Sequence, residues 1–102
     1  MKIVINKCYG GFSLSKKVYK ALNIKWDGYG YIQNKDLNIK SDNWKEYRTD
    51  KKLIKAIEKI GLKQSSGTHA ELEIIEIPDD VDWEIDDYDG IESVIDKKRH
   101  WG

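Results

Sequence analysis

The first thirty residues pass from a continuous apolar run to a helical spacing. Residues 3–5 are consecutive and β-branched, which predicts a strand that is covered on both faces. After Gly10 and Gly11, apolar residues recur at every fourth position and predict a short helix with one buried stripe. This stripe consists of Leu14, Val18 and Leu22. Either Ser13 or Ser15 can act as the N-cap of this helix.

A stronger helical pattern lies in the middle of the chain. Four apolar residues line one face of the segment 50–60, namely Leu53, Ile54, Ile57 and Ile60. Thr49 is positioned to cap the start of this helix, and Gly61 with Leu62 suits a left-handed C-cap with its usual apolar contact. Residues 25–48 have no clear period, and short irregular strands around residues 29–32 are the prediction for that segment.

The second half of the chain alternates apolar and acidic residues. The alternation changes phase between Ile74 and Ile75, which predicts a β-bulge there. After Pro78, the pattern of residues 81–86 predicts a half-buried strand with one acidic face. Asp89-Gly90 favours a turn, and residues 91–95 fit either the partner strand of a hairpin or a single helical turn.

These patterns predict an α+β fold, with two helices packed on a mostly antiparallel β-sheet. A chain of 102 residues suffices for one core, so we expect a single domain over residues 1–102. Cys8 is the only cysteine, which excludes an intramolecular disulfide. No run of the ~20 apolar residues needed to span a bilayer occurs, so we expect no membrane association and a cytoplasmic location.

The formal net charge of zero conceals an uneven distribution along the chain. Residues 1–63 carry fifteen Lys and Arg against six Asp and Glu, whereas residues 64–96 carry twelve carboxylates and no Lys or Arg. The basic half can neutralise the acidic half within the fold, or the acidic segment can form an interaction face. Direct nucleic-acid binding is disfavoured, because there is no dense basic cluster and no net positive charge.

The loop between the first strand and the first helix is the clearest candidate for a small-molecule site. Free N–H groups at a helix N-terminus favour an anion such as a nucleotide. The residues expected to contact it are Tyr9, Gly10, Gly11 and Ser13. Known phosphate-binding glycine patterns are absent, and the alternative is that the glycines serve a tight connection.

The chain offers little for catalysis or metal binding. Cys8 as a nucleophile would need a nearby histidine, and the only two, His69 and His100, are distant in sequence. No close pair of zinc ligands occurs, and the aspartates of the acidic segment do not follow the spacing of a calcium-binding loop. We therefore expect no enzymatic activity, no catalytic residue, no metal and no cofactor.

The acidic segment supports a binding hypothesis instead. Carboxylates that alternate outward along strands present a regular negative surface, which can compete with nucleic acid for a basic groove on another protein. The residues expected to form this surface are Asp82, Glu84, Asp86, Asp87 and Asp89.

Three segments, KIVINKCYGGFSLS, RTDKKLIKAIEKIG and AELEIIEIPDDVDWEIDDYDGIESVIDKKRHWG, resemble a family of small uncharacterised proteins from bacteriophages and prophages. The resemblance is most specific at CYGGFSLS, at IEIPDDV-W-I and at YDGIE. It implies a viral accessory protein that acts in the host cytoplasm and is not part of the virion.

With the acidic surface, this resemblance leads us to expect a non-enzymatic protein that binds a host protein and inhibits a bacterial defence system, as an anti-CRISPR protein does. The alternative is a protein that binds or sequesters a nucleotide or cyclic nucleotide at the Gly10-Gly11 loop. The oligomeric state is left open.

Overall fold

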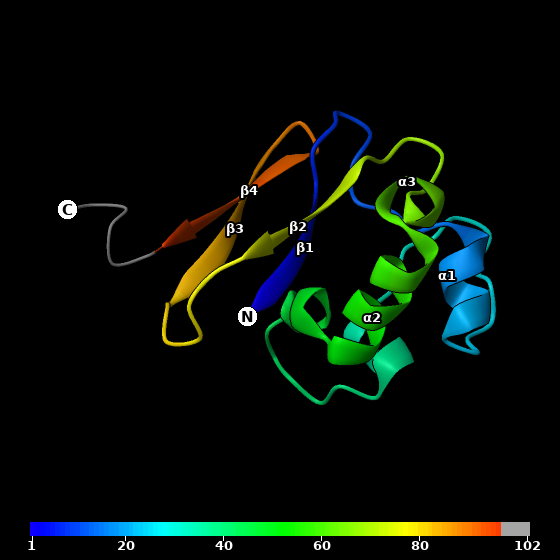
Figure 1. Cartoon of the computed structure of the whole chain (residues 1–102), viewed down its shortest axis with the longest axis horizontal. Coiled ribbons are helices and arrows are strands. Elements are labelled where there is room, and N and C mark those ends of the chain that lie inside the picture. The colour runs from blue at the N-terminus through cyan, green and yellow to red at the C-terminus, as the bar shows by residue number, and fades with distance from the viewer. Residues whose placement is uncertain (97–102) are drawn as a thin grey trace.

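The computed structural model describes residues 1–96, in which the helices gather on one side and a β-hairpin lies on the other (Figure 1). The strands are β1 (Lys2–Asn6), β2 (Leu72–Glu76), β3 (Trp83–Tyr88) and β4 (Ile91–Asp96). The α-helices are α1 (Lys16–Ala21), α2 (Lys51–Ile60) and α3 (Leu62–Ser65), and two 3₁₀ helices are η1 (Asn34–Leu37) and η2 (Glu46–Thr49). The predicted α+β class is confirmed, although the described residues contain a third short helix and two separate antiparallel sheets.

The first sheet pairs β1 with β2 in an unbroken antiparallel register. Ile3 lies opposite Ile75 and Val4 lies opposite Ile74, with one residue of each strand in every pair. The predicted bulge at residues 74–75 is therefore wrong. Ile74 and Ile75 are both half-buried, because each face of β2 is partly covered, and this explains the phase change without an extra residue.

The second sheet is the hairpin of β3 and β4. Its turn consists of Asp89 and Gly90, whose φ angles are 51° and 91°, and the N–H of Gly90 donates to the Asp87 carboxylate at 2.8 Å. Two successive residues with positive φ give the turn a twist that matches antiparallel strands. The predicted turn is confirmed, and residues 91–95 form a strand and not a helical turn.

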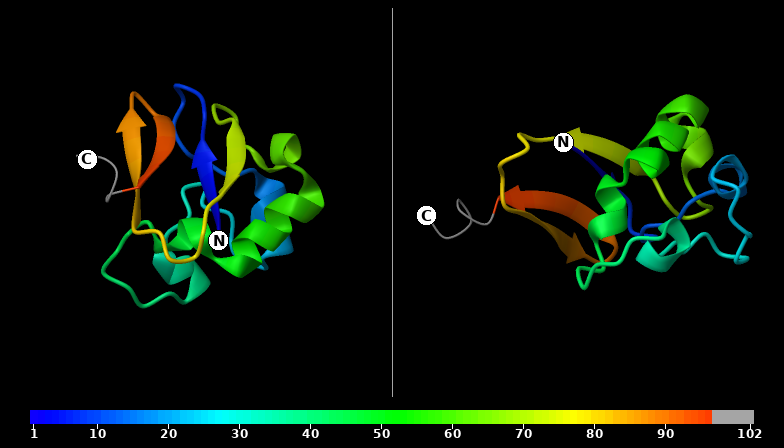
Figure 2. Two further views of the ribbon diagram at one scale, coloured as in Figure 1. Left: turned by 60° about the vertical axis from the view of Figure 1, so that its left-hand side comes forward. Right: turned by 90° about the horizontal axis from the view of Figure 1, so that it is seen from below.

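The core lies between β1 and the helices. Along β1, residues 3–6 are buried, as the apolar run predicts, and the stripes of α1 and α2 pack against its inner face. Figure 2 shows α1 and α2 gathered on the side of the first sheet that is away from the hairpin. The buried centre includes Val4, Leu14, Val18, Leu53 and Ile57.

Both helix starts differ from prediction in their capping. Asp50 caps α2, because its carboxylate accepts from the N–H of Leu53 at 3.0 Å, whereas the hydroxyl of Thr49 donates to the carbonyl of Glu46. Ser15 occupies the N-cap position of α1, but its hydroxyl donates to the carbonyl of Gln64.

The end of α2 also differs. Gly61 has the predicted positive φ, 100°, but its ψ of 146° is extended and not left-handed helical. Leu62 then begins α3 and is 41% exposed, so it makes no enclosed apolar contact behind α2. Residues 62–65 thus continue the chain as a short helix.

A buried ion pair holds the hairpin against the first sheet. The side chains of Arg48, on η2, and Glu92, on β4, are 2% and 4% exposed. Nη1 and Nη2 of Arg48 donate to the two carboxylate oxygens of Glu92 at 2.6 and 2.8 Å, a bidentate arrangement. The guanidinium carbon also lies 3.6 Å from the centre of the Phe12 ring.

The pair also satisfies the open edge of β1. Odd-numbered positions of β1 and its extension bond to β2, as Lys7 does to Glu71, so even-numbered positions face the other edge. There the carbonyl of Val4 accepts from Arg48 at 3.3 Å, and the N–H of Asn6 donates to Glu92 at 2.8 Å. The ion pair thus takes the place of a neighbouring strand.

We predict that Glu92→Gln lowers the free energy of unfolding by about 3 kcal/mol or more, because it leaves the charge of Arg48 buried without a counterion. Glu76→Gln, at an exposed position of β2, serves as the control and should change stability by less than about 0.5 kcal/mol. Urea denaturation measures both. A loss of less than about 1 kcal/mol for Glu92→Gln would contradict the role given to the pair.

Candidate functional site

The acidic residues predicted to bind a partner lie on the hairpin, at the end of the molecule opposite α1 (Figures 1 and 2). Among them, Glu84 is half-buried and the others are exposed, namely Asp82, Asp86, Asp87 and Asp89. The hairpin is joined to the remainder of the fold through the Arg48–Glu92 pair and through Asn6, whose side-chain amide donates to the carbonyl of Gly90 at 2.7 Å.

The five carboxylates do not form one row. Asp87 lies opposite Glu92 in the β3–β4 register, so its side chain leaves the hairpin on the face that Glu92 turns toward Arg48. Glu84 and Asp86 lie on the opposite face of β3, and Asp82 lies two residues before Glu84, ahead of the strand. The outer face of the hairpin therefore carries Glu84 and Asp86, with Asp82 just before it in the chain.

The other two predicted residues belong to the hairpin turn. The Asp87 carboxylate accepts from the turn N–H of Gly90, and Asp89 occupies a turn position with positive φ. The turn therefore accounts in part for the presence of aspartate at these two positions. We refer to Asp82, Glu84 and Asp86 as the acidic row.

The predicted ligand loop is packed against its neighbours. A side chain at Gly10 would meet the backbone carbonyl of His69, and one at Gly90 would meet the backbone of Tyr9 and Gly11, so these segments approach closely because glycine is there. Ser13 is buried, whereas Tyr9 is 71% exposed. A ligand at this loop stays a prediction, and its glycines have a structural explanation.

Cys8 lies beside His69 but does not contact its imidazole. The thiol donates to the backbone carbonyl of His69 at 2.9 Å and lies 3.5 Å from the amide oxygen of Asn6. Cys8 is half-buried and fits this polar corner. His100 lies outside the described residues.

Two further findings concern residues 1–96 as a whole. No group of three His, Cys, Asp or Glu side chains in them is arranged to hold a metal ion. None of their helices combines the length and the apolar composition that crossing a membrane requires.

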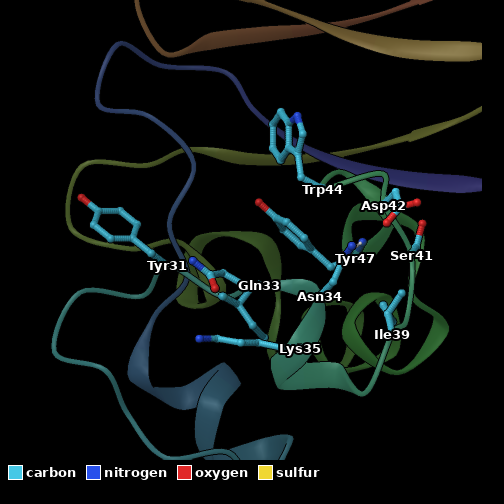
Figure 3. A pocket seen from close by; sticks show the side chains of 10 residues that line it. Tyr31, Gln33, Asn34, Lys35, Ile39, Ser41, Asp42, Trp44 and Tyr47 are labelled. Carbon is cyan, nitrogen blue, oxygen red and sulfur yellow. Dashed lines mark hydrogen bonds between the residues drawn. The ribbon is translucent and has the colours of Figure 1, made fainter.

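Residues 31–47 form a hollow that was not predicted from the sequence (Figure 3). Its volume is about 530 Å³, and Tyr31 and Trp44, each 61% exposed, stand at its rim. Tyr47 is buried behind them, and Lys35 and Asp42 add one charge of each sign to the lining. The only sequence signal was a set of aromatic residues among Asn, Asp and Gly, and it gave no indication of which rings would be exposed.

Side-chain hydrogen bonds fix the wall of this hollow. The amide of Asn34 accepts from the N–H of Tyr47 at 2.9 Å and donates to the carbonyl of Asn43 at 2.8 Å. One side chain thereby joins η1, η2 and the connection between them. This segment contains no strand, so local side-chain contacts take over the role that a sheet would have had.

Asp27 is the reason that residues 29–32 do not form the predicted strand. Its carboxylate accepts from the backbone N–H groups of Tyr29, Gly30 and Tyr31, at 2.8, 2.5 and 2.9 Å. These donors are therefore not available to a neighbouring strand. Desolvation alone would raise the pKa of Asp27, but the N–H donors outweigh it and hold the pKa below its usual value.

Comparisons of the chain with protein-family models, with curated proteins and with solved structures each find no match.

We predict that acid loosens the 27–31 turn. The pKa of Asp27 in the folded chain lies below that of an unfolded aspartate, about 3.9. Its stabilising contribution is therefore complete above that value and is lost as the pH falls through the lower, folded-state pKa. NMR titration of the Gly30 amide should show this transition below pH ~3.9, and Asp27→Asn should abolish it. A midpoint above that value would contradict the hydrogen-bonding explanation.

Proposed function

We propose that this protein is a non-enzymatic binding protein whose acidic row occupies a basic surface on a partner protein. The observation that carries the proposal is the position of Glu84 and Asp86 on one face of the hairpin, with Asp82 two residues before them, at the end of the molecule away from the helices. Successive residues on one face of a strand are about 6.6 Å apart, which gives a regular line of negative charge.

The anchoring of the hairpin supports this function. An isolated two-stranded hairpin is marginally stable in water, and ordering it upon binding would weaken the complex. Here the Arg48–Glu92 pair and Asn6 tie the hairpin to β1 before any partner arrives. The carboxylates are thereby held in a preorganised line.

The partner that this line fits is a protein that binds nucleic acid, because such proteins display basic grooves that bind phosphates. The resemblance to small phage and prophage proteins directs the proposal to a host protein. On this basis the protein inhibits a bacterial defence nuclease by occupying its nucleic-acid groove, in the manner of an anti-CRISPR protein.

We predict that neutralising the acidic row abolishes partner binding. The hairpin variant is Asp82→Asn, Glu84→Gln and Asp86→Asn, which keeps side-chain shape and removes three negative charges. A matched control is Asp42→Asn, Glu71→Gln and Glu76→Gln, three exposed carboxylates outside the hairpin. Each immobilised protein is incubated with nuclease-treated bacterial lysate, and captured proteins are quantified by mass spectrometry.

Nucleic-acid-binding proteins should be enriched on the wild type and on the control variant, should be eluted by short duplex DNA, and should be at least tenfold depleted on the hairpin variant. Equal capture by the hairpin variant, or failure of DNA to elute the captured proteins, would contradict the proposal. Circular dichroism confirms that both variants are folded before the capture is compared.

A further inference from the structure

A basic hollow is lined by residues of α1 and of the segment that follows it. The helix α1 lies at the end of the molecule opposite the hairpin (Figures 1 and 2). The volume of the hollow is about 730 Å³ and its lining contains four lysines, Lys16, Lys17, Lys20 and Lys25. All four are exposed, and no carboxylate lines the hollow. Lys17 donates to the neutral amide of Gln64 at 2.7 Å, so this contact leaves its charge uncompensated.

Two aromatic residues give the hollow a fixed apolar wall. Tyr19 is buried, Trp26 is half-buried, and their rings meet edge to face with centroids 5.0 Å apart. Both residues line the hollow with the lysines. The surface therefore combines cations at its rim with apolar area that stays in place.

The same chain carries the opposite charge at its other end. The net charge of the whole chain is zero, so two copies experience no overall repulsion. Opposite charges at opposite ends of one molecule favour contact between unlike surfaces, and a contact between unlike surfaces can continue from copy to copy, head to tail.

We propose that the basic hollow binds the acidic row of a second copy of this chain, so that copies associate head to tail. The spacing of the charges supports this pairing. Lys16 and Lys20 are one helical turn apart, about 6 Å, and alternate residues of β3 are about 6.6 Å apart. The contact uses the hairpin face on which the proposed function also rests, so a second copy competes with the partner protein.

A second copy fits the hollow better than nucleic acid does. Binding of a nucleic acid depends on neutralising many phosphates, and a chain with zero net charge and an acidic hairpin offers little such attraction. A second copy presents a short acidic line, and its own basic hollow then remains open for the next copy.

Three double or triple variants test the arrangement. The basic-hollow variant is Lys16→Glu and Lys20→Glu, and the hairpin variant is the one defined above. A matched control is Lys40→Glu and Lys59→Glu, two exposed lysines outside the hollow. Circular dichroism checks that all are folded, and light scattering coupled to size-exclusion chromatography measures the mass.

At high protein concentration and low salt, the wild type and the control should exceed twice the monomer mass. Raising the salt from ~20 mM to ~500 mM shortens the Debye length from about 20 Å to about 4 Å and should return both to monomers. The basic-hollow variant and the hairpin variant should each be monomeric alone. An equimolar mixture of the two should form a dimer and nothing larger, because only one complementary pair of surfaces remains.

A monomeric wild type at low salt, or larger species in the mixture, would overturn the proposal. Binding of duplex DNA by a wild type that stays monomeric, with loss of this binding in the basic-hollow variant, would overturn it in favour of nucleic acid. The basic-hollow variant retains the acidic row and should still capture partner proteins from lysate. Failure of self-association and failure of the proposed function are therefore separate results.

Discussion

The fold depends on one buried contact, the bidentate ion pair between Arg48 and Glu92. Both side chains are almost fully withdrawn from water, which costs several kcal/mol for each ion unless geometry and hydrogen bonding compensate. Here each ion compensates the charge of the other. The open edge of β1 adds an acceptor, the carbonyl of Val4, and a donor, the N–H of Asn6. Three parts of the chain therefore meet at a single site: η2 before the second helix, the first strand and the last strand. A hydrophobic replacement would leave those two backbone groups without partners, which gives a physical reason for charge at this place.

This contact also explains how the acidic hairpin stays attached to the first sheet. Many like charges on two strands repel one another, and such a hairpin has too little apolar surface to be stable alone. Glu92 belongs to the acidic segment, but its carboxylate points inward and pairs with Arg48. The acidic row lies at the hairpin end of the molecule, and the lysines of α1 lie at the opposite end. Both proposed interactions follow from this arrangement of opposite charges.

The parts of the fold that could be predicted from sequence are those that local patterns determine. The apolar run of β1, the stripe of α2 and the Asp89-Gly90 turn each depend on neighbouring residues alone. Arg48 and Glu92 are 44 positions apart and resemble surface charges, so their burial could not be predicted. One signal was available, because Arg48 is one of only two arginines in a chain otherwise rich in lysine, and arginine is the cation suited to bidentate buried pairs. Residues 29–32 were misjudged because the Asp27 carboxylate binds the N–H groups that a strand would use. The acidic row could be predicted from its alternation, whereas the assignment of Asp87 and Asp89 to the turn required the register.

The most direct test of the ion pair's role is hydrogen exchange at the Asn6 amide, which points away from β2 and has Glu92 as its acceptor. This amide should exchange as slowly as the β1 amides that are bonded to β2. Removal of the Glu92 side chain in Glu92→Ala should accelerate exchange at Asn6 far more than within α2. An Asn6 amide that exchanges at the rate of an unprotected backbone group in the wild type, while α2 remains protected, would show that the ion pair does not close the edge of β1.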